Sequence, residues 1–377
     1  MASASVSLAP RARFTRAGAF QDDLKRRVDL YFEHTRQART GGWRMRANAA
    51  VLLGWLAASY ALLVFAHPVW WVAVPLAVSV GLAMAGVGFG VMHDGNHGSA
   101  AASPRENRLF AFTSDLLGGS SFLWRHKHNV LHHSYTNVCG LDTDIEPGVL
   151  LRFAPAQPRR ALHRFQHLYV WILYAVFPLR WWLVDDFHQL ATGRMGEGRF
   201  ARPRGWDLIA LLGGKALFLG WAFVLPLLLH PWGSALPLML VAVATLGTML
   251  AVVFQLAHCV GEAEFHDAHT EPPTGDWAAH QVATTVDFAR GNRLLGWYMG
   301  GLNFQIEHHL FPRVSHVHYA ALAPMVEETC REHGVPYRAQ PSFLAAVRSN
   351  VRWLRQLGRA AGDERRPAPI LTATPGG

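Results

Sequence analysis

Four long runs of apolar residues dominate the pattern of the chain. About 20 consecutive apolar residues are enough for a helix to cross the hydrocarbon core of a bilayer. Each run reaches that length, and Lys215 is the single charged residue within them. The sequence therefore predicts four transmembrane helices, at about residues 47–66, 69–92, 208–229 and 234–257.

Short turns connect these runs in pairs. His67-Pro68 lies between the first two runs, and residues 230–233 lie between the last two. The second run also contains Gly81 and Gly86, and small residues permit close approach of helices in lipid. We therefore expect two tight hairpins.

The remaining segments predict peripheral elements. Residues 1–46 contain a polar tail and then an amphipathic helix from Phe20 to Arg39, which lies either on the membrane surface or against the protein's own body. Residues 109–124 and 167–184 are apolar but interrupted, which favours buried or interfacial helices. Residues 47–357 would form one membrane domain, and 358–377 a disordered tail. The fold class is all-α integral membrane, with interfacial helices and a cytoplasmic helical cap.

Composition agrees with a membrane protein, because only 16% of the residues are charged, against about 25% in soluble proteins. The 35 Lys and Arg residues avoid both short turns: 10 precede the first run, 13 separate the second from the third, and 11 follow the fourth. The positive-inside rule then places both termini and the polar segments in the cytoplasm, in a multi-pass protein of the cytoplasmic membrane. Orientation explains the net charge of +9, so nucleic-acid binding is not needed.

Histidines gather where the predicted spans end and in the polar segments between them. A stretch from Trp124 to Asn137 carries four, and a helix would place His128 and His132 one turn apart with His133 beside them. Further clusters follow the second run and lie near residue 308, and one histidine ends the fourth run. The eight candidates are His93, His97, His128, His132, His133, His258, His308 and His309.

Eight imidazoles would suffice for two metal ions with about four protein ligands each. Neutral imidazole suits iron, copper or zinc, so residue type alone leaves the metal open. Carboxylates are scarce in these clusters, which argues against the di-iron bundle built on Glu-x-x-His. Cys139, Cys259 and Cys330 form no CxxC pair, so a cysteine zinc site is not expected.

Three of these clusters resemble the histidine boxes of the membrane fatty acid desaturases. The boxes are His93-x-x-x-His97, His128-x-x-x-His132-His133 and Gln305-x-x-His308-His309. Gln305, the segment Gly118–Trp124 and the segment Asn303–Pro312 resemble the front-end, linoleoyl-CoA Δ6-desaturase-like branch. The similarity extends over roughly residues 25–357.

The resemblance implies a non-haem di-iron centre that uses O₂ and two electrons to form a double bond in an acyl chain. It implies that the eight histidines are iron ligands, whereas Gln305 would bind iron weakly, bind through water, or steer His309. Asp94 is a candidate acceptor for a ligand imidazole, or else a carboxylate that stabilises a helix end. Asn129, Asp142 and Asp144 are further candidates for orienting ligands.

The substrate would be an acyl-CoA or an acyl-lipid taken from the bilayer. The printed residues contain no His-Pro-Gly-Gly haem motif, so the resemblance implies a separate electron donor, a ferredoxin or cytochrome b5 with its reductase. Two alternatives remain open here. One is a membrane di-iron hydroxylase or acetylenase with the same boxes, and the other is a histidine-rich membrane metal transporter.

Overall fold

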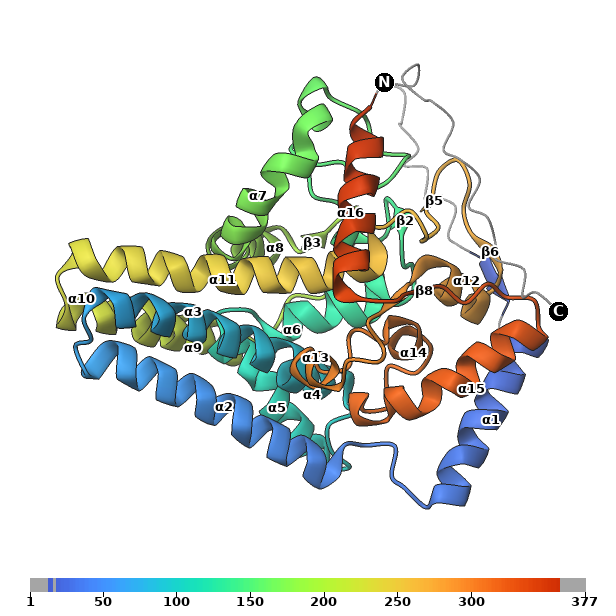
Figure 1. Cartoon of the computed structure of the whole chain (residues 1–377), viewed down its shortest axis with the longest axis horizontal. Helices are drawn as coiled ribbons and strands as arrows, with labels where there is room; N and C mark the ends of the chain where they lie inside the picture. The colour runs from blue at the N-terminus through green and yellow to red at the C-terminus, as the bar shows by residue number, and fades with distance from the viewer. Residues whose placement is uncertain (1–12, 16–17, 360–377) are drawn as a thin grey trace.

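The computed structural model describes residues 13–15 and 18–359, and in them the chain is mainly helical (Figure 1). Four long helical units lie side by side. The first is α2 (Gly42–Phe65), and the second runs from α3 (Trp70–Val87) through η1 (Gly88–Met92) to α4 (His93–His97). The third comprises α9 (Trp206–Leu219), η6 (Gly220–Val224) and α10 (Leu225–Leu229), and the fourth is α11 (Trp232–His258). These units correspond to the four predicted runs, joined by the two predicted short turns.

Small residues bring the hairpins into close contact. A Cβ atom on Gly81 would lie 2.5 Å from the carbonyl oxygen of Ala242 on α11, so only glycine fits at this crossing. Close packing of this kind lets helices associate in lipid, where the hydrophobic effect does not drive them together.

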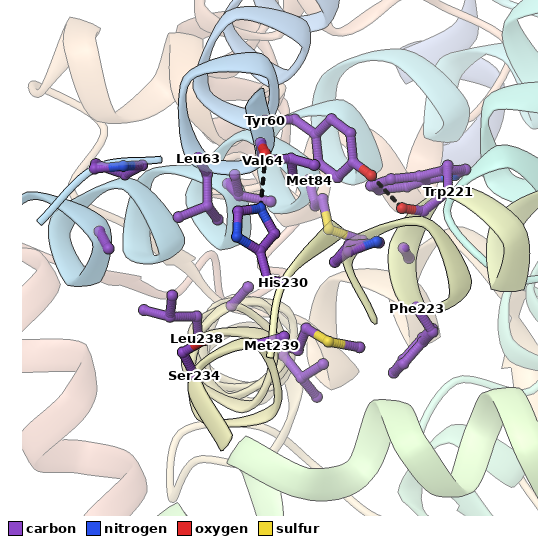
Figure 2. A pocket seen from close by; sticks show the side chains of 18 of the residues that line it. Tyr60, Leu63, Val64, Met84, Trp221, Phe223, His230, Ser234, Leu238 and Met239 are labelled. Carbon is purple, nitrogen blue, oxygen red and sulfur yellow. Dashed lines mark hydrogen bonds between the residues drawn. The ribbon is translucent and has the colours of Figure 1, made fainter. Parts of the chain in front are cut away.

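An apolar cavity of about 280 Å³ lies between the hairpins (Figure 2). Met84, Trp221, Phe223 and Met239 contribute to its wall, and His230 lines the end near the short turns. The Tyr60 hydroxyl donates to the carbonyl of Trp221. This contact ties α2 to η6 across the cavity wall.

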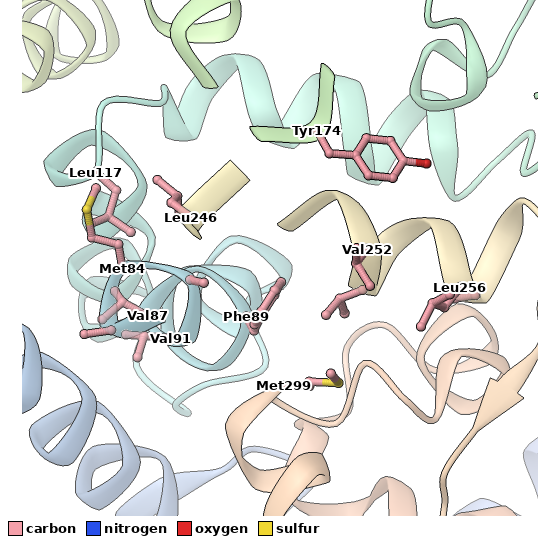
Figure 3. Close-up of a cluster of buried hydrophobic side chains, with 14 of the residues drawn as sticks. Met84, Val87, Phe89, Val91, Leu117, Tyr174, Leu246, Val252, Leu256 and Met299 are labelled. Atoms are coloured by element: carbon pink, nitrogen blue, oxygen red, sulfur yellow. The ribbon is translucent and has the colours of Figure 1, made fainter. Parts of the chain in front are cut away.

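The largest buried cluster among the described residues shares Met84 with the lining of this cavity and continues to Val91, two residues before His93. Figure 3 shows part of this cluster. Met84 and Val87 of α3 belong to it with Leu246 and Val252 of α11, and Met299 continues it beyond the long helices. The same packing therefore fixes both the helix bundle and the segments that cover one end of it.

The structure contains a fifth helix long and apolar enough to span a membrane, where the sequence predicted an interfacial element. It covers Ala161–Thr192 and contains α7 (Gln166–Arg180), η5 (Trp181–Asp185) and α8 (Asp186–Thr192). Pro178 stays inside α7, because its ring packs where Gly247 of α11 has no side chain. In Figure 1, α7 crosses α11 steeply, whereas the other four units run alongside one another.

Lys215 faces the protein, as the sequence allowed. Its Nζ atom lies 2.6 Å from Asp186 and 3.2 Å from the carbonyl oxygen of Trp182, and it also donates to Gly118. Both side chains of the ion pair are buried. A buried charge of this kind is tolerated only when it is paired and hydrogen-bonded.

A cap covers the histidine-bearing end of the bundle. It contains α1 (Ala19–Thr35), α12 (Trp277–Thr284), α13 (Arg293–Tyr298), α14 (Gln305–Leu310), α15 (Tyr319–Glu332) and α16 (Phe343–Gly358). Leu24, Val28 and Phe32 of α1 are buried and pack against the cap. Of the two readings of the amphipathic helix, the structure therefore supports the one in which it packs on the protein.

Short elements complete the fold. They are α5 (Pro104–Leu116), α6 (Ser121–Trp124), η2 (Arg125–His132), η3 (Thr143–Ile145), η4 (Ala161–Phe165) and η7 (His316–His318). Four two-stranded sheets pair β1 (Arg13–Thr15) with β6 (Thr274–Asp276), β2 (Val138–Cys139) with β5 (His266–Asp267), β3 (Arg194–Met195) with β4 (Gly198–Arg199), and β7 (Asp287–Phe288) with β8 (Ala339–Gln340). The predicted disordered tail falls outside the described residues, apart from Gly358, which ends α16, and Arg359.

Candidate metal centre

The fold brings all eight predicted histidines together at one end of the helix bundle. Each box is held by a helical segment, and His258 is the last residue of α11. The first box lies on α4, the second lies on η2 and the residue after it, and the third lies on α14. The expectation that distant clusters converge is therefore confirmed for His93, His97, His128, His132, His133, His258, His308 and His309.

The imidazoles fall into two main groups. In each group, one nitrogen of every ring lies within 4.8 Å of the corresponding nitrogens of the others. The first group contains His93, His97, His128 and His308, and the second contains His132, His258 and His309. The ring of His133 stands between them, because it forms a further group with His308 and His309 and stacks on His309 at 4.4 Å. This arrangement can hold two metal ions side by side.

Several ring nitrogens at the centre are buried and have no hydrogen-bond partner among the described residues. They include Nε2 of His97, His132, His308 and His309. Nε2 of His93 and Nε2 of His128 lie only 3.3 Å apart. A buried polar atom without a partner costs about 1–3 kcal/mol, so such a collection requires compensation. Metal coordination would satisfy these lone pairs, and the donor set fits a transition metal.

Burial also keeps several of these rings in the form that binds metal. It lowers the pKa of His133, His308 and His309 well below the usual value, and it lowers the pKa of His128 to about 4. The imidazoles are therefore neutral at physiological pH and have free lone pairs. His132 differs, because its burial is outweighed by Asp142 and its pKa is raised.

The nitrogens that face away from the centre are fixed by surrounding side chains. Nδ1 of His132 donates to Asp142 at 2.9 Å, and Nδ1 of His309 donates to Gln281 at 2.8 Å. Nδ1 of His308 donates to the Tyr319 hydroxyl at 3.1 Å, which itself donates to the carbonyl of Val314. A hydrogen bond at Nδ1 sets the tautomer and points Nε2 toward the centre.

The predicted role of Asp142 and Asp144 in orienting ligands agrees with the geometry. Asp142 holds His132 and also accepts from the backbone N–H of Asn137 at 2.9 Å. Asp144 lies 3.6 Å from Nδ1 of His128 and forms an ion pair with Lys127 at 2.7 Å. The second box is therefore anchored by two carboxylates that follow it in the sequence.

Two roles were left open for Asp94, and its contacts do not include a ligand imidazole. Its carboxylate accepts from Ser315 Oγ at 2.7 Å and from the backbone N–H of His316 at 3.2 Å, and Nδ1 of His316 lies 3.0 Å away. None of its hydrogen bonds among the described residues involves the eight histidines. The side chain points away from the centre and joins α4 to the segment that follows the third box. Asp94 thus positions the first box through the backbone.

Asn129 and Gln305 have more specific partners than the sequence indicated. Nδ2 of Asn129 donates to the carbonyl of Asn96 at 2.9 Å and so connects the first two boxes. Nε2 of Gln305 lies 2.9 Å from Nε2 of His258. The amide of Gln305 therefore contacts His258, whereas His309 is held by Gln281.

Sequence reasoning missed three residues that support the centre. Gln281 and Tyr319 contact ligand candidates, but neither belongs to a recognisable motif. Glu307 lies within the third box, yet its carboxylate lies beside Asp287 and is 2.9 Å from the Tyr337 hydroxyl. Burial raises the pKa of Asp287 to about 6 and also raises that of Glu307. The hydrogen bond between Glu307 and Tyr337 therefore holds α14 in place on the side away from the histidines.

Comparisons with known proteins agree with this geometry. The family model described as fatty acid desaturase matches residues 69–341. The chain is 36% identical to the sn-1 linoleoyl-lipid 6-desaturase of Synechocystis, over 94% of this chain and 99% of that protein. It is 35% identical to the sn-1 linoleoyl-lipid 6-desaturase of Arthrospira platensis, over 93% and 96% of the two chains. It is also 39% identical to the acyl-lipid (8-3)-desaturase of Physcomitrium patens, over 89% of this chain and 71% of that protein.

The match includes all three boxes and the helices that carry them. It confirms the predicted oxidoreductase activity in lipid metabolism and favours it over a metal transporter. The apolar helices and the histidine groups agree with a membrane enzyme that has a metal site. The chain therefore belongs to the fatty acid desaturase family, whose members introduce a double bond into an acyl chain.

Proposed function

We propose that this protein is a front-end acyl-lipid desaturase whose eight histidines bind two iron ions. His93, His97, His128 and His308 would hold one ion, and His132, His133, His258 and His309 the other. The observation that carries this proposal is the convergence of buried imidazole nitrogens that have no other partner among the described residues. Gln305 is left without a direct metal bond, because its amide contacts His258.

The bound irons would use O₂ and two electrons to break an unactivated C–H bond. The protein's own contribution is to hold the ligands and the substrate. Asp142, Gln281 and Tyr319 fix three ligand rings by their outer nitrogens. These contacts would hold the donor nitrogens in position before the substrate binds.

The apolar cavity between the hairpins suits the methyl-terminal part of an acyl chain (Figure 2). Its wall is formed by side chains such as Leu63, Met84 and Phe223, which offer no polar group to compete with hydrocarbon. Two relatives are named linoleoyl-lipid desaturases and a third an acyl-lipid desaturase. We therefore infer an acyl-lipid substrate.

The orientation in the membrane follows from the charges and the helix directions. We infer that the four long helical units, which lie side by side, cross the bilayer. We also infer that α7, which is steeply inclined to them, lies at the interface. Both termini and the metal centre would then face the cytoplasm, in agreement with the placement of the basic residues. A ferredoxin, or cytochrome b5 with its reductase, would supply electrons at that face.

The proposal is tested by expressing the protein in a host that contains linoleoyl lipids and analysing acyl chains by mass spectrometry. We expect a new double bond between the carboxyl group and the existing ones. A hydroxylated chain without a new double bond would instead support the hydroxylase alternative. Purified protein should contain about two irons, the number that two groups of about four imidazoles can hold. Metal uptake into vesicles without acyl products would support the transporter alternative.

A further inference from the structure

A second, polar cavity of about 510 Å³ opens beside the metal centre. It is bounded by α4, α5, η2 and the loop at Pro312–Arg313, and the rings of His97 and His133 form part of its wall. Unlike the apolar cavity, it therefore reaches two of the proposed iron ligands directly. The role inferred for it rests on the proposed function, because it concerns the carrier to which the acyl chain is attached.

Three arginines give this cavity a positive charge. Arg108, Arg125 and Arg313 line it, and its described lining contains no carboxylate. Arg108 and Arg313 are exposed and form no hydrogen bond or ion pair with the described part of the chain. The Arg125 guanidinium donates to the Asn96 side-chain oxygen at 3.3 Å. Its distance to the Asp207 carboxylate is 3.9 Å, which is a weak contact. The guanidinium groups thus retain most of their donors for a ligand.

Two of the polar side chains between these arginines, Asn96 and Asn107, are already used by the protein. Asn107 donates to the carbonyls of Ala101 at 2.6 Å and Gly98 at 3.2 Å. Asn96 donates to the carbonyl of Met92 at 3.0 Å. These contacts make a fixed wall, so recognition of a ligand depends on the arginines. A planar guanidinium binds phosphate or carboxylate oxygens in pairs, which indicates an anionic ligand.

The size and surroundings of the cavity indicate a small anion at a membrane surface. Its volume lies within the range of about 300–1,000 Å³ that is typical of small-ligand sites. A small ligand therefore fits in this cavity, whereas a protein partner is too large to enter it. Leu109, next to Arg108, and Trp206, next to Asp207, are 67% and 71% exposed. Large exposed apolar side chains beside basic ones are typical of protein that touches the headgroup layer.

We propose that this cavity binds the phosphate group of the acyl carrier and so holds the carboxyl end of the acyl chain beside His97 and His133. In a front-end reaction, only a short stretch of chain separates the ester from the reacting carbons. The carrier must therefore lie next to the irons, where this cavity opens. The methyl-terminal part of the chain would occupy the apolar cavity among the long helices. A phospholipid and an acyl-CoA share the phosphate chemistry.

The first test is binding without turnover. Full-length protein in detergent is titrated with short-chain phosphatidylglycerol and, separately, with a neutral galactolipid of the same acyl chains, and bound lipid is measured by native mass spectrometry. Arg108→Gln combined with Arg313→Gln should weaken phosphatidylglycerol binding about tenfold or more, as expected for lost charge-assisted contacts. Galactolipid binding should not change. The matched control is Arg105→Gln, because Arg105 is also exposed on α5 but does not line the cavity.

The second test separates the possible carriers. Desaturation is followed with linoleoyl phosphatidylglycerol, linoleoyl galactolipid and linoleoyl-CoA, in micelles of a non-ionic detergent that contains no phosphate. The double variant should raise KM for a phosphate-bearing carrier and leave kcat nearly unchanged. A loss confined to phosphatidylglycerol identifies a phospholipid headgroup, and a loss confined to linoleoyl-CoA identifies the CoA phosphates.

Two outcomes would overturn the inference. One is unchanged phosphatidylglycerol binding together with an unchanged KM for linoleoyl-CoA in the double variant. The other is an equal loss of rate with all three carriers that disappears when dithionite replaces the protein donor, because the arginines would then dock that donor. Iron content and melting temperature of each variant exclude misfolding. Failure of the proposed function has a different signature, since the wild type would then form no double bond with any carrier.

Discussion

Two sets of neighbouring imidazoles lie at opposite ends of the long helices, and they differ in how their nitrogens are used. At the metal centre, buried ring nitrogens converge and lack partners in the described chain. At the other end, the rings of His67 and His230 are also close, at 4.8 Å, but Nε2 of His230 donates to the carbonyl of Val64 at 2.7 Å and His67 is exposed. Proximity of histidines is therefore a poor sign of a metal site. Buried nitrogens without a partner are a better one.

Substitutions at the metal centre and at the His67/His230 end should differ most in their effect on activity when a proposed metal ligand is removed. His132→Ala and His309→Ala should each abolish desaturation, with a loss greater than the about 10–100-fold that follows removal of an outer contact. Iron content, measured by plasma mass spectrometry, should fall with activity. Full activity and unchanged iron in either variant would contradict the assignment of these rings as ligands.

Removing the metal should act at the same end. Prolonged chelation should eliminate activity and lower the melting temperature, because the buried nitrogens lose their partner while remaining out of water. Differential scanning fluorimetry of chelated and reloaded protein measures this shift. The matched control is His309→Ala, which should respond less to the chelator. An identical melting curve before and after complete iron removal would argue that the centre contributes nothing to stability.

A smaller effect is expected one contact away from the metal. Gln281→Leu removes the acceptor for Nδ1 of His309 and should lower activity about 10–100-fold. Gln281→Glu keeps an acceptor at this position and should restore much of the loss. Rate measurements combined with iron analysis test both variants. If the two variants behave alike, the amide oxygen does not orient the ring.

The opposite end should respond least. His230→Leu removes one hydrogen bond and should lower the free energy of unfolding by about 0.5–1.5 kcal/mol, with iron content unchanged. His67→Ala should leave the iron content and the free energy of unfolding almost unchanged, because its exposed ring supports neither the metal centre nor the core. Chemical denaturation and iron analysis provide the measurements. Loss of iron in either variant would mean that the two sets of histidines are coupled.

The sequence was a good guide to the parts of the molecule that repeat a simple physical pattern. The four long helical units could be predicted because each is a long apolar run in the sequence. His258 was identified without a cluster partner in the sequence, because it ends a span at the same depth as the first box. The helix at Ala161–Thr192 was read differently, since Pro178 and Arg180 looked like interruptions. In the structure, Pro178 packs against Gly247 and Arg180 pairs with Asp185 at 3.1 Å.

The features that the sequence did not reveal depend on contacts between distant segments. Gln281 holds His309, and Tyr319 holds His308, but no spacing rule connects either pair. In the polar cavity, Arg313 likewise comes from a segment far along the chain from Arg108 and Arg125. The sequence left two roles open for Asp94, and neither indicated its partners Ser315 and His316, which come from a distant part of the chain. Local patterns cannot specify such pairs.

The order in which the ligands occur along the chain has a consequence for biogenesis. The ribosome synthesises His93 and His97 early, whereas His308 and His309 emerge only after both hairpins have been made. Because each group of donors includes a ring from the third box, neither site is complete in a nascent polypeptide. If these histidines bind metal as proposed, loading has to wait until translation has almost finished, and a chain truncated before α14 would lack part of both proposed sites.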